Sequence, residues 1–160
     1  MKLKNKSGIT YIVAFFMLFQ LFSSCEKDDI CLEPTTPKLN IRFYDTNQTT
    51  DVKAVEHFSL TALPGQQIVI QDKNTDSISI ALNVNENSSK FIFINNNNTD
   101  TVVFQYEREF VFVSKSCGYK CIFHNLQANV ITDPDNWIVN TAIIYPEITI
   151  DTVAHVKIYH

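Results

Sequence analysis

Hydrophobic and polar residues alternate along much of the chain beyond residue 38. Leu39, Ile41 and Phe43 fall on one side of an extended chain, while the residues between them fall on the other. The same period of two recurs at positions 68 and 70 and at positions 78, 80, 82 and 84. Because successive side chains of a β-strand point to opposite faces, these segments predict strands with one buried face. Further β-branched and aromatic runs cover residues 91–94, 102–106, 110–113, 120–123, 138–145, 148–150 and 153–159.

The strand pattern predicts an all-β fold. No segment has helical periodicity, and roughly nine or ten short strands separated by polar turns are typical of a sandwich or a small barrel. Antiparallel sheets with one solvent-facing side explain the alternation, so we expect a single antiparallel β-sandwich domain over residues 38–160. Asn95–Asn98 and Asp133–Asn136 have the composition of turns. Pro146 predicts an edge, a bulge or a turn, because proline cannot donate to a sheet ladder.

Residues 1–24 have the organisation of a secretory signal. Lys2, Lys4 and Lys6 precede an apolar stretch over residues 9–22. This stretch is shorter than the roughly 20 apolar residues of a transmembrane helix. Ser23 and Ser24 place two small residues directly before Cys25, which is typical of a lipoprotein processing site.

We therefore expect a lipoprotein signal peptide over residues 1–24 and a lipidated tether over residues 25–37. Cys25 would carry the acyl groups that hold the protein on the lipid bilayer, since two or more chains give stable anchoring. Pro34 and Pro37 favour an extended tether. The sequence therefore predicts a domain held close to the membrane.

Charge narrows the choice of partners. Three of the 13 Lys and Arg residues and none of the 17 Asp and Glu residues lie in residues 1–24, so the remaining chain has a net charge of −7. This charge opposes nucleic-acid binding, which depends on cations that neutralise phosphates. It also opposes nonspecific docking on anionic lipid.

The sequence lacks the motifs of common enzymes. There is no Gly-x-Ser-x-Gly elbow, no His-Glu-x-x-His pair and no glycine-rich phosphate loop. Glu107 and Glu109 flank Arg108 in a manner typical of an exposed charged strand rather than an acid–base pair. We expect a non-catalytic protein without a cofactor.

Three cysteines remain besides Cys25, and an oxidising compartment favours pairing of two of them. We expect Cys31 to pair with Cys117, because a bond there would hold the tether against the sandwich. The alternative is a copper or zinc site formed by Cys117, Cys121 and His124, since thiolates and imidazole suit these metals. This spacing lacks a fourth ligand, and Cys121 could equally be a buried free thiol.

Several segments together resemble a known family. These are Cys25–Cys31 (CEKDDIC), Thr36–Leu39 (TPKL), Arg42–Asp45 (RFYD), Phe110–Ser114 (FVFVS), Cys117–Lys120 (CGYK) and His155–Tyr159 (HVKIY). They are similar to uncharacterised lipoproteins of Bacteroidota-type bacteria, classed as a domain of unknown function. The resemblance implies that Cys31 and Cys117 form the family's disulfide and that Cys121 is an addition of this sequence. It implies no particular activity.

The same resemblance bears on location and modification. Lys27, Asp28 and Asp29 resemble the signal that sends such lipoproteins to the outer face of the outer membrane, although a solvated tether would have the same composition. Three short motifs resemble an O-glycosylation acceptor and also read as turns that enter strands. Their acceptor residues are Ser77, Thr101 and Thr152.

Three classes of function are consistent with these features, and the third is a lipoprotein that binds copper or zinc at Cys117, Cys121 and His124. The first is an accessory or assembly subunit that binds an outer-membrane protein, because a short tether raises the effective concentration of the domain near membrane partners. The second is a surface glycan-binding module. Its candidate stacking residues are Tyr44, Tyr106, Tyr119, Trp137 and Tyr145. An exposed edge strand would favour the first class, and a contiguous exposed aromatic patch would favour the second.

Overall fold

The computed structural model describes residues 30–32 and 36–160. The chain divides into two units, residues 1–31 and 32–160, and every described strand lies in the second unit. The predicted signal peptide, the lipidation site Cys25 and the export residues Lys27, Asp28 and Asp29 lie outside the described residues.

The second unit is all-β. Its described residues form nine strands and no α-helix, so none of them could cross a membrane as a helix. The strands are β1 (Leu39–Tyr44), β2 (Val55–Leu63), β3 (Gln67–Thr75), β4 (Ser77–Ile80), β5 (Ser88–Asn95), β6 (Asn98–Ser114), β7 (Gly118–Val130), β8 (Asn140–Ile143) and β9 (Val156–Tyr159).

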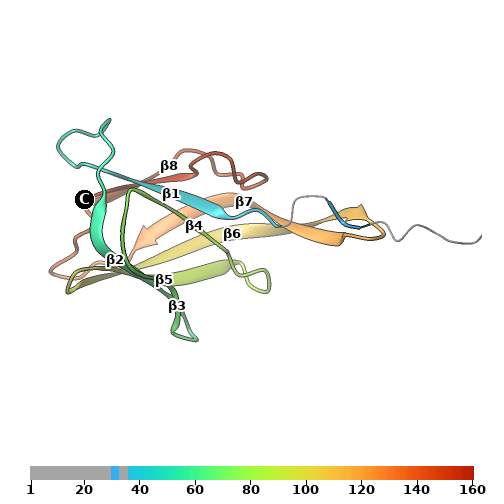
Figure 1. The fold of residues 1–160 in the computed structure, drawn as a ribbon, viewed down its shortest axis with the longest axis horizontal. Helices are drawn as coiled ribbons and strands as arrows, with labels where there is room; N and C mark the ends of the chain where they lie inside the picture. The colour runs from blue at the N-terminus through green and yellow to red at the C-terminus, as the bar shows by residue number, and fades with distance from the viewer. Residues whose placement is uncertain (1–29, 33–35) are drawn as a thin grey trace, which may run out of the picture. The chain divides into compact units, whose positions relative to one another are not determined.

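The strands form two sheets, which confirms the predicted β-sandwich (Figure 1). The four-stranded sheet has the order β4-β1-β9-β8, and the five-stranded sheet has the order β3-β2-β5-β6-β7. All strand pairs are antiparallel except β1 and β9, which run parallel. The last strand along the chain therefore lies between β1 and β8, inside its sheet.

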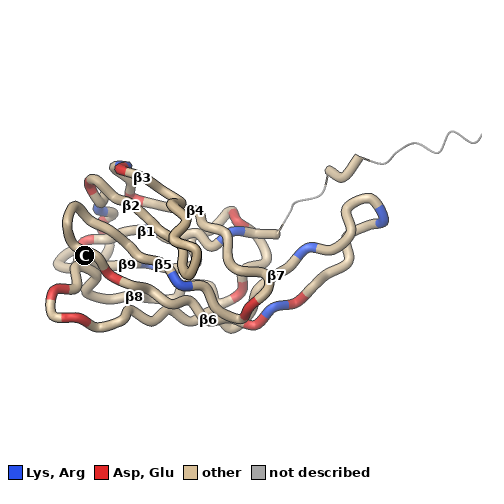
Figure 2. The backbone as a smooth tube through the Cα atoms, turned by 90° about the horizontal axis from the view of Figure 1, so that it is seen from below, with Lys and Arg blue, Asp and Glu red and all other residues tan. Residues whose placement is uncertain are grey.

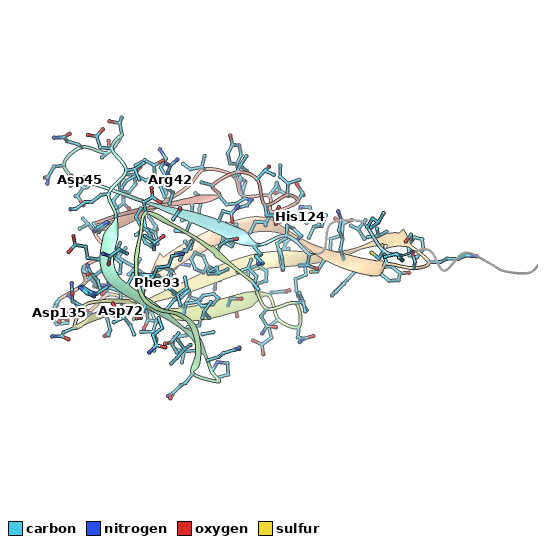
Figure 3. The ribbon with its side chains drawn as sticks, in the orientation of Figure 1. Arg42, Asp45, Asp72, Phe93, His124 and Asp135 are labelled. Carbon is cyan, nitrogen blue, oxygen red and sulfur yellow. The ribbon has the colours of Figure 1, made fainter. Side chains whose placement is uncertain are left out.

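Phenylalanine rings dominate the core. Phe43, Phe58, Phe93, Phe104 and Phe123 are each 0% exposed. The Phe58 ring lies with its centroid 5.4 Å from that of Phe43 and 5.8 Å from that of Phe93, so side chains of both sheets meet there (Figure 3). The predicted inward positions of β1 are confirmed, since Leu39 and Ile41 are also fully buried.

Several predicted segments differ from the structure. Ile68 was expected on a buried face, but its side chain is 60% exposed because β3 is the edge strand of its sheet. The runs 102–106 and 110–113 belong to one long strand, β6. The run 148–150 forms no strand, and only Ile148 makes an isolated bridge, with Phe123. Asn95–Asn98 forms the predicted turn, between β5 and β6.

Candidate functional site

The ends of β6 and β7 form a two-stranded extension beyond the rest of the sheet, which we call the arm (residues 108–123). The ladder between β5 and β6 ends at the pair Ser88 and Gln105, whereas β6 and β7 remain paired as far as Ser114 and Gly118. In Figure 1 the two strands project past the ends of the other strands. Among the described residues, no further strand pairs with either backbone edge of the arm, and Phe123 at its base makes an isolated bridge with Ile148.

Aromatic side chains on the arm are exposed. Phe110 is 57% exposed, Phe112 is 55% exposed and Tyr119 is 69% exposed. Phe112 and Tyr119 are register partners, and their ring centroids lie 5.3 Å apart with an interplanar angle of 66°. We call these three residues the aromatic patch. Exposed aromatic residues grouped on one element are typical of an interaction surface.

Charge differs along the arm. Lys115 lies in the turn at its outer end and Lys120 lies in the adjoining part of β7, whereas Glu107 and Glu109 lie where β6 leaves the sandwich. Figure 2 shows cations toward the outer end and acids together with a cation nearer the sandwich. A partner with an apolar surface and an acidic rim would complement the outer end.

His124 joins the base of the arm to the segment after β8 (Figure 3). Its Nε2 lies 2.9 Å from Oε2 of Glu109, and its Nδ1 contacts Oε2 of Glu147. The hydrogen bond to Glu147, reinforced by Glu109, raises the pKa of His124. A protonated His124 donates to both carboxylates, so the group acts as a charged clamp at the base.

A second set of hydrogen bonds holds the same base from the other side. The hydroxyl groups of Tyr106 and Ser89 lie 2.6 Å apart, and the Tyr106 hydroxyl donates to the carbonyl of Asn83 at 2.9 Å. Arg108 donates to the carbonyl of Val84 at 2.8 Å. Burial raises the pKa of Tyr106, which keeps this phenol in its donating form. The base of the arm is thus held by polar contacts that are buried or partly buried.

The described cysteines have different environments. Cys31 and Cys117, the residues expected to pair, both occur as disulfide-bonded residues, and Cys117 lies next to the arm's outer turn. Among the described residues Cys121 is the free cysteine and is 2% exposed. Burial raises the pKa of the Cys121 thiol. The backbone amide of Cys121 donates to Oγ1 of Thr36 at 3.0 Å, which places residue 36 beside β7.

These environments argue against the alternative metal site at Cys117, Cys121 and His124. A disulfide sulfur is not the thiolate that copper or zinc requires. Cys121 belongs to the buried core cluster, and His124 is engaged by two carboxylates instead. Within residues 30–32 and 36–160, no group of three or more His, Cys, Asp or Glu residues could hold a metal ion.

A family comparison covers the arm and most of the sandwich. A model of a family of unknown function, DUF6452, matches residues 57–160. The chain belongs to the DUF6452 family. No curated protein and no solved structure matches it. The DUF6452 match includes the aromatic patch, both glutamates that contact His124, and Cys117.

The other predicted site residues of this DUF6452 chain lie apart from the arm. Ser77 and Thr152 are exposed and line one groove, while Thr101 is half-buried in β6 opposite Ile92. An exposed hydroxyl is accessible to a modifying enzyme, so Ser77 and Thr152 remain the more accessible candidates for O-glycosylation.

The five candidate stacking residues do not form one exposed platform. Tyr44 is 9% exposed, Tyr106 is 3% exposed and Trp137 packs against the core. Tyr145 and Tyr119 are both exposed, but the ring that packs against Tyr119 is Phe112, which was not among the five candidates. The alternation of these tyrosines with polar residues could not reveal which of them face inward.

The structure also contains the exposed edge strand that would favour a protein partner. β3 forms one edge of the five-stranded sheet, and none of its nine residues is fully buried. Ile68 and Val69 are 60% and 42% exposed. Asp72 has a positive φ of 42°, and irregular register with β2 interrupts the flatness of this edge.

The sequence pattern alone does not mark the aromatic patch as an exposed surface. A signal was present, because Phe112 and Tyr119 lie at similar distances from the turn at residues 115–117. A hairpin centred on that turn pairs them across the strands. The sequence does not show that the pair is exposed, because this depends on where the pairing of β5 with β6 stops.

Proposed function

We propose that this chain is a non-catalytic lipoprotein of the outer membrane and an accessory subunit that binds an outer-membrane protein through the arm. The observation that carries the proposal is the aromatic patch of Phe110, Phe112 and Tyr119, each more than half exposed on a projecting element. Solvent-exposed aromatics contribute little to the stability of the free protein, whereas buried aromatic anchors contribute strongly to interfaces.

A contiguous exposed aromatic patch was the expected feature of a glycan-binding module, but the geometry of this patch favours a protein surface over a sugar. Phe112 and Tyr119 meet edge to face at 66°, so they do not present two coplanar faces to a flat ligand. Phenylalanine also lacks the polar group that tyrosine and tryptophan offer at a wet binding site. The combination fits insertion of ring edges into an apolar pocket of a folded partner.

The arm is also held in position before binding. His124 connects it to Glu147, while Arg108 connects it to the loop before β5. A preorganised surface loses less conformational freedom when it binds, so more of the contact energy appears as affinity. These contacts support a docking role for an element that would otherwise be a marginally stable hairpin.

The sequence supports attachment beside a membrane partner. Acylation of Cys25 would place the sandwich close to the bilayer, because the expected tether spans only residues 25–37. Confinement near the bilayer raises the effective concentration of the arm toward a membrane protein. Display on the outer face, indicated by Lys27, Asp28 and Asp29, would make the partner a surface-exposed protein or complex.

The test is a crosslinked pull-down of the lipidated protein from its native outer membrane. We expect one membrane protein in near-stoichiometric amount. A Phe110→Ser, Phe112→Ser variant should lose that partner while retaining its anchor. A matched Ile144→Ser, Tyr145→Ser variant removes two exposed apolar side chains outside the arm and should retain the partner.

Two results would contradict the proposal. Recovery of no reproducible partner would exclude an accessory subunit and would direct attention to a surface glycan-binding module. Equal recovery with both double variants would show that the arm is not the docking element. A Cys25→Ala variant, which cannot be acylated, distinguishes direct affinity for the partner from confinement at the membrane.

A further inference from the structure

A second surface, separate from the arm, lies on the solvent side of the four-stranded sheet. Arg42 on β1 is the register partner of Lys157 on β9, and on its other side it is the register partner of Ser77 on β4 (Figure 3). Residues in register on neighbouring strands point to the same face of the sheet. Two cations therefore lie side by side on this face.

No acid on the described strands neutralises these cations. The strand residues that share this face of β4, β1, β9 and β8 include no Asp or Glu. The Lys157 ammonium lies 4.4 Å from the centroid of the Tyr44 ring. Among the described residues, the side chain of Arg42 has no hydrogen bond and no ion pair. Like charges directly opposite on adjacent strands destabilise a sheet, and a bound anion would remove that cost.

A groove begins at Arg42. Its volume is about 600 Å³, and a second cation, Lys73 of β3, also lines it. The described residues give the Lys73 side chain no polar partner either. The hydroxyl groups of Ser77, Ser79 and Thr152 contribute to the wall, and no carboxylate does. The volume falls within the range of small-ligand sites.

The polar groups of the groove differ in their availability. The Ser77 hydroxyl already donates to Asp76 at 2.8 Å, and the amide of Asn40 donates to the carbonyls of Asp151 and Val153. Ser79 and Thr152 have no such side-chain contact among the described residues. Two cations and two available hydroxyls thus line the groove together with the partly buried Ile70.

A groove on the five-stranded sheet has a different composition. The groove over the outer side of β5, β6 and β7 has a volume of about 440 Å³ and is lined by amides and Glu107, without a cation. In a chain whose residues 25–160 have a net charge of −7, a groove with two cations and no acid is a local reversal of charge.

We propose that the groove lined by Arg42 and Lys73 binds an acidic sugar, a saccharide unit that carries a phosphate or carboxylate group. Arg42 and Lys73 contact the anionic group, for which the planar guanidinium offers paired donors. Ser79 and Thr152 bind the sugar hydroxyls, and Ile70 contacts the apolar edge of the ring. The proposal concerns residues outside the arm, so its outcome is independent of partner docking.

The test is an NMR titration of the whole chain in detergent micelles with four probes. The probes are glucuronate, a glucose phosphate ester, glucose and inorganic phosphate. We expect both acidic sugars to shift amide signals of β1, β4 and residues 152–154. Glucose and inorganic phosphate should each bind about tenfold more weakly, because each lacks one half of the recognised group.

Variants assign the effect to the groove. An Arg42→Gln, Lys73→Gln variant should lose about tenfold or more in affinity for both acidic sugars. Lys90→Gln removes an exposed cation on β5, outside this groove, and should bind as the wild type does. Ser79→Ala should weaken binding of the acidic sugars and leave inorganic phosphate unaffected.

Several results would overturn the proposal. Binding of glucose as tight as that of glucuronate would show that the cations do not recognise the ligand. Inorganic phosphate that binds as tightly as the sugar phosphate, with no effect of Ser79→Ala, would reduce the groove to an anion site. Equal loss in the Lys90→Gln control, or no binding of either acidic sugar, would also exclude it.

Discussion

The sandwich and the arm use the same strand in opposite ways. In β6, Phe104 is 0% exposed because the opposing sheet covers it, whereas Phe112 is 55% exposed eight residues further along. Both residues are aromatic and both have an antiparallel register partner in β7, although a register irregularity follows each of them. The difference comes from the neighbouring strand, because β5 pairs with β6 only as far as Ser88 and Gln105, at the base of the arm. Burial here depends on the length of adjacent strands rather than on residue type.

The comparison also shows how each region is stabilised. The sandwich is stabilised by apolar burial, at roughly 25 cal/mol for each Å² removed from water. A two-stranded hairpin is marginal in water without such burial. The arm depends instead on the disulfide at Cys117 and on polar contacts of His124 and Arg108 at its base. The two regions should therefore respond differently to substitution.

The largest contrast is expected between two phenylalanines of β6. Phe104→Ala should reduce the free energy of unfolding by about 3 to 5 kcal/mol, because it leaves a cavity in the core. Phe112→Ala should change it by only about 0.5 kcal/mol. Chemical denaturation followed by tryptophan fluorescence measures both. Similar losses in the two variants would mean that the arm packs against something in solution.

The disulfide should matter more to the arm than to the core. Cys31→Ser with Cys117→Ser removes the expected pair and should reduce the free energy of unfolding by about 2 to 4 kcal/mol. Hydrogen exchange should accelerate most in residues 108–123, where the hairpin lacks other support. Uniform acceleration across β5 and β6 would contradict this division.

The hydroxyl of Tyr106 tests the base of the arm. Tyr106→Phe keeps the ring, whose centroid lies 5.0 Å from that of Phe123, and removes the bonds to Ser89 and Asn83. We expect a loss of about 1 to 2 kcal/mol, since the Asn83 carbonyl loses its donor. Thermal unfolding measures it. An unchanged midpoint would show that solvent replaces the hydroxyl.

The smallest expected effect depends on pH and involves His124. The carboxylates raise its folded-state pKa above the ordinary value of 6.5, so the clamp stabilises the fold below that pH and is lost as pH rises through the folded-state pKa. His124→Gln should therefore lower the unfolding midpoint at about pH 5.5 and have less effect at about pH 8.5. The opposite order would exclude the charged clamp. Burial lowers the pKa of His155 in both proteins, so its contribution cancels in the comparison.

Alternation predicted the strands that lie under the opposite sheet. In β1 and β4, every second residue is buried, as the pattern of Leu39, Ile41 and Ile78 indicated. The sandwich itself was predicted from these strands and from the turns between them. Where the backbone is regular and one face of the strand is covered, the period of two in hydrophobic residues indicates which side chains are buried.

The sequence pattern failed at backbone irregularities and at edges. β2 was missed because His57 has a positive φ of 52° and adds a residue between Val55 and Phe58, which breaks the period of two. Ile68 follows the period but lies on an edge strand. The clamp at His124 joins residues 109, 124 and 147, which no local spacing connects.

The position of β9 has a consequence for the order of folding. β9 lies between β1 and β8, and its partner β1 lies more than 110 residues earlier in the chain. The four-stranded sheet therefore cannot close until nearly all of the described chain has been synthesised. Long-range pairing of this kind is slow. Until β9 is made, β1 keeps one backbone edge unpaired, and an unpaired strand edge can pair with other chains.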